Sequence, residues 1–208
     1  MRKQNVHVQT LTELQTVDYP RNSKFFARID TPKKAYWLGF LYADGYISTR
    51  NEIRIQLKRD DENHLRKFRE AIQAINHQIG YCERRDGEKI FYQAYFSIHD
   101  KEMVADLKRL GCYNNKSSSL VFPAYKQVPL KYMSHFIRGY FDGDGSINYS
   151  KSTYVRNTDG KSANHWKISF VGTPEFLTGL KKVLNKDSIT LERVTGNNYT
   201  TLSIGGNN

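Results

Sequence analysis

The stretch YWLGFLYADGYIS, residues 36–48, returns later in the chain as FIRGYFDGDGSIN, residues 136–148. Both copies place a glycine inside an apolar or aromatic run and end that run with Asp-Gly. One copy is a weak signal, because any helix that stops at a glycine C-cap produces similar letters. Two copies with the same spacing, each followed by β-strand patterns, predict one structural unit that the chain contains twice.

The composition is that of a basic globular protein. The 208 residues are 38% hydrophobic and 13% aromatic, which suffices for a packed core. The formal net charge of +11 predicts a polyanionic partner, and nucleic acid is the commonest one. No apolar run approaches the roughly 18 residues of a membrane span. The first residues also lack the apolar stretch of a signal peptide, and Cys82 and Cys112 have no metal-ligand spacing. We therefore expect a cytoplasmic protein without membrane contact, encoded by a bacterium or phage, with an organelle as the alternative.

The two units follow the same order of predicted elements. After the first motif, alternating apolar and polar residues at 52–58 predict a strand with one basic face. A helix at 62–76, a hairpin at 81–98 and a second helix at 101–111 follow. The second unit repeats a strand at 165–172, a helix at 174–185 with Thr173 as N-cap, and a hairpin at 188–204. Such strands predict antiparallel sheets with one face against helices and the other face free.

The predicted boundaries are a first half at 35–111, a linker at 112–132 and a second half at 133–208. Residues 1–34 match neither unit and stay unassigned. Residues 148–165 read as a long loop that contacts the ligand. The second half ends in Gly-Gly-Asn-Asn, where the first half continues into a helix. We therefore expect a truncated chain that lacks its final helix, and apolar sheet surface left open in the second half.

The doubled motif places its glycines and carboxylates where they are costly. Gly39 and Gly139 lie inside helices, where glycine costs up to about 1 kcal/mol, and close helix–helix packing would offset that cost. Gly45 and Gly145 are expected to end the helices with positive φ. The preceding aspartates lie at helix C-termini, whose partial charge is already negative. If the two helices pack together, the two carboxylates meet and require cations, as in two-metal phosphodiester hydrolysis.

The two stretches, together with NNKSSSLVFP at 114–123, resemble the paired motifs of the LAGLIDADG (dodecapeptide) homing endonucleases in their single-chain form. The resemblance covers roughly residues 24–204. It implies an α+β fold of two pseudo-symmetric αββαββ(α) halves, with motif helices packed at the centre and antiparallel sheets forming a saddle over DNA. It also implies a monomeric, metal-dependent endodeoxyribonuclease that cuts both strands of a long double-stranded target. The implied cofactor is Mg²⁺, with Mn²⁺ as a substitute.

Carried over residue by residue, the resemblance assigns catalysis and metal binding to Asp44 and Asp144. It assigns the helix interface to the four motif glycines, Gly39, Gly139, Gly45 and Gly145. An earlier motif acid falls on Asp142 in the second copy and on Tyr42 in the first. The linker lysine falls on Lys116. The strand-end position of each half holds His99 and Gly205, and this asymmetry puts equal cleavage of the two strands in doubt.

The residues expected to contact DNA are those on the free faces of the strands, where Arg and Gln suit major-groove recognition. A solvated polar face is the alternative for each of them, and an ordinary strand-end histidine is the alternative for His99. These candidates are Arg54, Gln56, Lys58, Arg84, Gln93, Tyr95, Lys167, Ser169, Thr201 and Ser203.

Two other functions remain open from the sequence. One is a DNA-binding regulator with weak or no cleavage, and retention of both Asp44 and Asp144 argues against it. The other is a maturase that binds intron RNA. The sequence does not define the DNA target or whether an intron, an intein or a free-standing gene encodes the chain.

Overall fold

The computed structural model describes residues 19–155, 162–185, 189–193 and 200–207. The first half begins with helix α1 (Pro32–Asp44), followed by strands β1 (Gly45–Ile47) and β2 (Glu52–Lys58) and helix α2 (Glu62–Ala71). Strands β3 (Gly80–Asp86) and β4 (Lys89–His99) and helix α3 (Lys101–Arg109) complete it. Its antiparallel sheet has the order β1-β2-β4-β3.

The second half repeats this order with one difference. Helix α4 (Leu130–Asp144) leads into strands β5 (Gly145–Val155) and β6 (Ser162–Gly172), helix α5 (Pro174–Leu184), and strands β7 (Ile189–Arg193) and β8 (Thr200–Asn207). The sheet order is β5-β6-β8-β7, so the two sheets have the same topology. Within the described residues, no helix follows β8 as α3 follows β4. The predicted α+β class with two related halves is confirmed.

The strand registers define which residues of the two halves correspond. Gly45 pairs with Ile55 in the first sheet, and Gly145 pairs with Phe170 in the second. Ile55 then pairs with Phe96, and Phe170 pairs with Leu202. These matched pairs allow each position of one half to be compared with its counterpart in the other.

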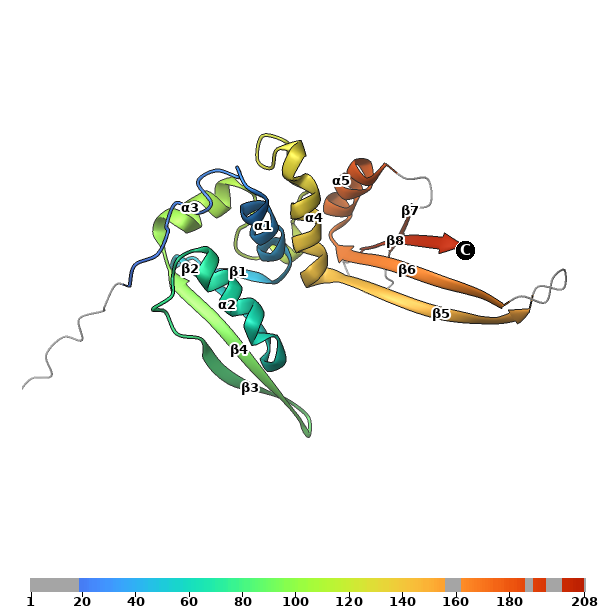
Figure 1. The fold of residues 1–208 in the computed structure, drawn as a ribbon, viewed down its shortest axis with the longest axis horizontal. Helices are drawn as coiled ribbons and strands as arrows, with labels where there is room; N and C mark the ends of the chain where they lie inside the picture. Colours follow the sequence, from blue (N-terminus) through green and yellow to red (C-terminus); the bar gives the residue numbers. More distant parts are fainter. Residues whose placement is uncertain (1–18, 156–161, 186–188, 194–199, 208) are drawn as a thin grey trace, which may run out of the picture.

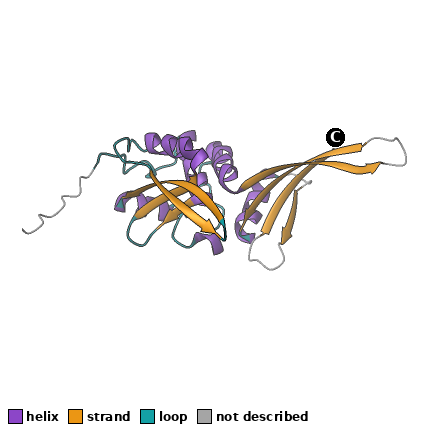
Figure 2. Cartoon of the chain, turned by 90° about the horizontal axis from the view of Figure 1, so that it is seen from below, coloured by secondary structure: helices purple, strands orange, loops and turns teal. Residues whose placement is uncertain are grey.

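Helices α1 and α4 lie side by side at the centre, with one sheet on each side of the pair (Figures 1 and 2). A Cβ at Gly39 would collide with the backbone carbonyl of Phe136, and a Cβ at Gly139 would collide with that of Tyr36. Both glycines therefore permit backbone contact between the helices, and this contact explains how glycine is tolerated inside a helix.

The structure corrects the predicted conformation of Gly45 and Gly145. Their φ angles are −74° and −96°, so neither adopts the left-handed region. Each glycine continues directly into a strand and donates its N–H to the last turn of its own helix. A Cβ at Gly45 would lie 2.6 Å from the carbonyl oxygen of Leu41, so glycine is required by a close approach to its own helix.

The predicted loop at 148–165 is also wrong. Most of it belongs to β5 and β6, which form a long antiparallel hairpin with a register shift between Lys151 and Val155. Because a long unpaired connection would leave its backbone polar groups without partners, pairing into strands is the favourable alternative. The hairpin extends beyond the helices on one side of the molecule (Figure 1).

The predicted helix at 62–76 ends earlier than expected. Helix α2 ends at Ala71, and Gln73 adopts a positive φ of 58°. Ile75 therefore falls outside the helix and is exposed instead of lying on its apolar face.

Residues 19–31 pack on the first half. Phe25, Phe26 and Ile29 are buried in the core. The guanidinium of Arg21 forms a salt bridge of 2.7 Å with Asp100, which also caps the start of α3. The described part of the segment that sequence patterns left unassigned is thus a component of the first half.

Candidate active site

The two motif aspartates are the last residues of the two central helices. Asp44 ends α1 and Asp144 ends α4, and both are half-buried. Gly143 brings the helix ends together, since a Cβ at that position would lie 3.1 Å from Oδ2 of Asp44. The helix interface therefore includes Gly143, which motif matching missed because its counterpart in the first copy is Ala43.

The electrostatics of the pair show two carboxylates at one poorly solvated place. Burial raises the pKa of Asp144 to about 6, and the negative charge of Asp44 raises it as well. Burial also raises the pKa of Asp44. The nearby Lys116 ammonium opposes both shifts, but it does not remove either of them. Lys116 thus does not fully compensate the negative charge of the two carboxylates. Such uncompensated negative charge is expected at a site that binds a cation.

Lys116 lies against this centre although it comes from the linker. Its side chain is buried, and Nζ donates a hydrogen bond of 3.0 Å to the carbonyl oxygen of Ala43, beside Asp44. A cavity of about 260 Å³ joins Lys116 to Asp144, and Tyr140 and Thr173 also line it. Lys116 is thus a component of the centre, and the prediction from the linker motif is consistent with this position.

Tyr140 is a further residue of the centre that sequence reasoning did not identify. Its hydroxyl donates its hydrogen to the carbonyl oxygen of Val171 at 2.8 Å, and it lies close enough to Asp144 to influence the pKa of that carboxyl group. Its ring stacks on Phe176 of α5, with centroids 4.1 Å apart. The only signal was its place directly after Gly139, where the first copy has Phe40.

Asp142 is exposed and bridges the two halves. Its Oδ2 accepts a hydrogen bond of 2.7 Å from the Tyr36 hydroxyl, which also lies 3.1 Å from Nε2 of His64. At the counterpart positions Tyr42 packs on Phe136, with centroids 5.0 Å apart. The two matched contacts between the helices therefore differ in kind. Tyr36 and Asp142 form a hydrogen bond, whereas Tyr42, which departs from the motif, forms an aromatic contact with Phe136. This arrangement favours a structural role for Asp142.

His99 and Gly205 occupy matching strand positions, as the sequence predicted. His99 pairs with Glu52, three residues from Ile55, and Gly205 pairs with Lys167, three residues from Phe170. At about 3.4 Å per residue, three residues correspond to about 10 Å along the strand from the level of the motif glycines. The Nδ1 atom of His99 faces the carbonyl oxygen of Arg50 at 3.4 Å. This position favours the ordinary strand-end histidine.

The free face of the first sheet carries the predicted contact residues together. Arg54 lies over the ring of Tyr95, with its guanidinium carbon 3.9 Å from the ring centroid. Gln56 donates a hydrogen bond of 2.8 Å to Gln93. Cross-strand partners share a face of the sheet, and the pairs on this face include Gln56 with Tyr95 and Lys58 with Gln93.

Phe91 belongs to the same face and was missed. It pairs with Arg84 and is exposed, and both line a hollow of about 580 Å³ together with Lys58. The period-two pattern that selected Gln93 and Tyr95 also includes Phe91, two residues before Gln93. The face is thus a mixed cationic and aromatic surface.

The second sheet supports only part of its predicted contact set. Lys167 is exposed and Thr201 is half-buried. Ser169 and Ser203 lie on the predicted face, because they pair with each other two residues from Lys167, but both are buried, with their Oγ atoms 3.4 Å apart. They are therefore not the accessible side chains that the sequence analysis expected.

The donor set fits a divalent cation in an open site. Mg²⁺ is satisfied by one or two carboxylates together with water and phosphate oxygens. The described residues contain no group of three or more His, Cys, Asp or Glu side chains that would form a closed metal site. Asp44 and Asp144, with their raised pKa values, are therefore the residues that would hold such an ion.

The fold is that of the LAGLIDADG homing endonucleases. The chain is similar to the LAGLIDADG homing endonuclease I-LtrWI bound to target DNA, with a TM-score of 0.56 and 9% identity over 89% of this chain and 80% of that one. It is also similar to the LAGLIDADG meganuclease I-AabMI bound to uncleaved DNA, with a TM-score of 0.50 and 11% identity over 86% and 79% of the two chains.

A third similar structure is the meganuclease I-SmaMI, bound to an uncleaved DNA target in the presence of calcium ions. Its TM-score is 0.51, with 10% identity over 85% of this chain and 79% of that one. No protein-family model matches the chain, and no curated protein matches it significantly. At these identities the likeness concerns the fold.

In the described part of the chain, every helix is too short or too polar to cross a bilayer.

Proposed function

We propose that this protein is a homing-type DNA endonuclease that hydrolyses both strands of a long double-stranded target with the help of divalent metal. The observation that carries the proposal is the meeting of Asp44 and Asp144 at the ends of two packed helices. The two sheets on either side of that centre supply the binding surface (Figure 1). The DNA-bound state of the similar structures agrees with this arrangement.

Asp44 and Asp144 would hold Mg²⁺, or Mn²⁺ in its place. The bound metal would supply Lewis-acid activation of the scissile phosphates and of water. The protein's part is to hold the two carboxylates in place and ionised. Lys116 contributes by favouring their charged forms.

The free faces of the sheets would bind the duplex along its length. Arg54, Lys58 and Arg84 place positive charge on the first sheet, and Lys167 places it on the second. Such residues neutralise phosphates and, when they reach base edges, distinguish sequences. Among the described side chains of the second sheet, Ser169 and Ser203 are buried, so the contacts of its free face would come from residues such as Lys167 and Thr201.

The test is cleavage of a plasmid that carries the host locus without the mobile element, in Mg²⁺. Asp44→Asn and Asp144→Asn each remove a charge and a metal ligand but little volume. Each should reduce cleavage by at least about 100-fold while binding is retained, a loss of about 2.7 kcal/mol of transition-state stabilisation. Glu102→Gln on the exposed side of α3 is the control and should cut at the wild-type rate. Wild-type rates for both active-site variants would place the active site elsewhere.

The same assay separates the other functions. Tight binding of the duplex without cleavage, in Mg²⁺ and in Mn²⁺, would indicate a DNA-binding regulator. Failure to bind the duplex, together with binding and splicing of the intron transcript, would indicate a maturase.

A further inference from the structure

Phe91 is an apolar side chain on an otherwise polar surface. It pairs with Arg84 and is two residues from Gln93, so it shares the free face of the first sheet with the proposed DNA contacts. Among the described strands of that sheet, it is the one non-glycine residue of the free face whose side chain carries no nitrogen, oxygen or sulfur atom. The residue is nevertheless 45% exposed. Single exposed apolar residues are common on protein surfaces, so the neighbours of Phe91 decide what its exposure means.

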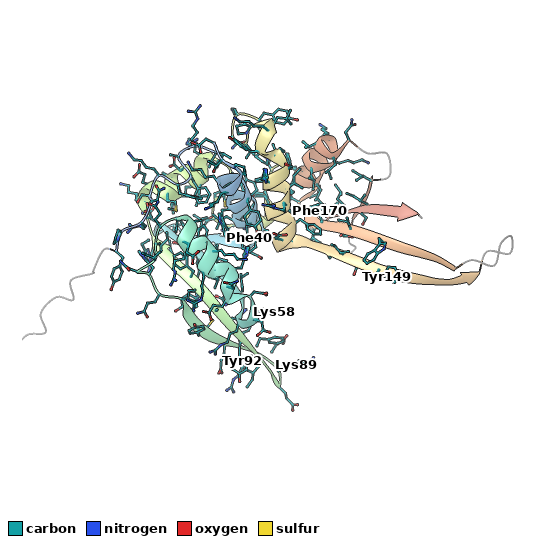
Figure 3. The ribbon with its side chains drawn as sticks, viewed as in Figure 1. Phe40, Lys58, Lys89, Tyr92, Tyr149 and Phe170 are labelled. Atoms are coloured by element: carbon teal, nitrogen blue, oxygen red, sulfur yellow. The ribbon has the colours of Figure 1, made fainter. Side chains whose placement is uncertain are left out.

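Phe91 borders the hollow of about 580 Å³ at the outer part of the hairpin formed by β3 and β4. Strand β2 ends at Lys58, which pairs with Gln93, so β4 is paired only with β3 from Lys89 to Tyr92. The labelled Lys58, Lys89 and Tyr92 mark this region (Figure 3). The hollow therefore lies where β2 stops, and it leaves space beside the ring of Phe91.

The charged residues near Phe91 on the free face are mainly cationic. Lys58, Arg84 and Lys89 each carry a positive charge, and Asp86 carries a negative one. All four side chains are exposed. Such an excess of cations attracts the phosphates of a duplex, and phosphate contacts fix how the bases lie against the protein. The local charge therefore favours DNA as the ligand that meets this apolar ring.

The chemistry of base edges determines what the ring can recognise. In the major groove, thymine presents a C5 methyl group, whereas the edges of the other three bases present hydrogen-bonding groups. A phenylalanine ring cannot satisfy those groups, but it can contact the methyl group. Gln93 and Arg84 beside it have the hydrogen-bonding groups that suit the other bases.

We propose, building on the function proposed above, that Phe91 is a specificity-determining residue that selects thymine through contact with its C5 methyl group. The register gives the place of this contact. Phe91 is five residues from Phe96, which pairs with Ile55, the partner of Gly45. At about 3.4 Å per residue, this corresponds to about 17 Å, or about five base pairs on a strand that follows the duplex.

Uracil provides the probe, because it differs from thymine by the methyl group alone and keeps every hydrogen-bonding group. The full chain first selects a duplex from a randomised library in EDTA, so that the DNA stays uncut. Each thymine of the selected duplex is then replaced by uracil, one at a time, and the affinity is measured. We expect one thymine, about five base pairs from the centre of the site, where uracil weakens binding about four-fold, as for the loss of one buried methyl group.

Variants of the full chain assign this effect to a residue. Phe91→Ala should bind the thymine duplex and the uracil duplex equally, because the apolar contact is gone. Tyr125→Ala removes an aromatic side chain that is 56% exposed on the linker, outside both sheets, and should keep the four-fold difference. Melting temperatures equal to wild type show that both variants fold. Phe91→Gln, which is polar and of comparable length, replaces Phe91→Ala if that variant melts early.

Three results would overturn the proposal. Equal affinity of the wild-type chain for thymine and uracil at every position would refute the methyl contact and leave the proposed function intact. A four-fold uracil effect that persists in Phe91→Ala would assign the contact to another residue. Failure of the wild-type chain to select or bind any duplex would refute this inference and the proposed function together.

Discussion

At the scale of single residues, the carboxylates are held in an unfavourable state. Asp44 and Asp144 end two helices at the same place, so helix dipoles and mutual repulsion both disfavour their ionised forms. Burial adds to this effect, and it raises the pKa of Asp144 to about 6. Glutamine or asparagine would fold there at lower cost. The presence of two acids at this place is therefore better explained by function than by stability.

The raised pKa of Asp144 predicts a pH-dependent stability difference. A carboxyl group whose pKa is about 6 in the folded state and 3.8 in the unfolded state favours folding in its protonated form. That advantage is present below pH 3.8, decreases between pH 4 and 6, and is absent at pH 8. Without metal, Asp144→Asn should therefore raise the free energy of unfolding at pH 8 by about 1 to 3 kcal/mol relative to wild type.

Urea unfolding in EDTA at pH 8 and at pH 4 measures this effect. The difference between Asp144→Asn and wild type should shrink at pH 4, where the wild-type carboxyl is largely protonated in the folded protein. Glu102→Gln, at an exposed position of α3, controls for loss of an acid elsewhere in the chain. An equal difference at both pH values would mean that Asp144 is well solvated.

The candidate catalytic residues Asp44 and Asp144 were predictable because they belong to the repeated motif, whereas the residues around them were not. Tyr140 and Gly143 reach the centre only through the crossing of α1 and α4, and no pattern in a single segment encodes that crossing. Ser169 and Ser203 show the reverse case. Strand alternation placed them on the free face, as the register does, but alternation does not show whether a short side chain on that face is accessible.

At the scale of elements, the central helix pair depends on two backbone contacts. Glycine at 39 and 139 allows each helix to approach a carbonyl of the other. Gly39→Leu or Gly139→Leu should therefore force the helices apart and destabilise the whole chain by about 1 to 3 kcal/mol or more. Thermal melting should show both variants below wild type.

Gly205→Leu is the matched control for this prediction. A Cβ at Gly205 meets no atom within 4 Å, so the added side chain has open space. Its melting temperature should stay close to that of wild type. If Gly39→Leu and Gly139→Leu melt at the control temperature, the helices do not pack through these glycines.

The local sequence pattern predicted which segments form helices and strands, but it did not predict where several of these elements begin and end. The hairpin between β3 and β4 was predictable from its Asp-Gly turn, where Gly87 has a positive φ of 59°. The predicted loop at 148–165 failed because its composition is polar and turn-rich, yet β5 and β6 pair along most of it. Pairing between strands is a property of two segments, so one segment read alone understates it.

At the scale of the whole molecule, the two halves have the same topology but different side chains on their free faces. The two sheets share one topology, yet their free faces carry different side chains at matched central positions. The first sheet offers Arg54, Gln56 and Tyr95 where the second offers Ser169, Val171 and Thr201. If the protein binds DNA as proposed, an asymmetric protein of this kind is suited to an asymmetric target, because each half would contact different base pairs.

The charge of the molecule predicts how its binding responds to salt. If the free faces neutralise phosphates, log K for duplex DNA should fall linearly with log salt, with a slope of about −0.9 for each neutralised phosphate. Lys58→Ala removes an exposed cation from the free face of the first sheet and should reduce the magnitude of that slope by about 1. Lys101→Ala removes an exposed cation from α3, on the covered side of the same sheet, and should leave the slope unchanged.

Arg54→Ala should differ from both of these lysine variants, because Arg54 is held over Tyr95 and can contact a base edge. Its cost should be about 1 to 3 kcal/mol and confined to one or two base pairs of a selected target. Filter binding at a series of salt concentrations measures all three variants, and a wild-type affinity that is independent of salt would exclude nucleic acid as the ligand.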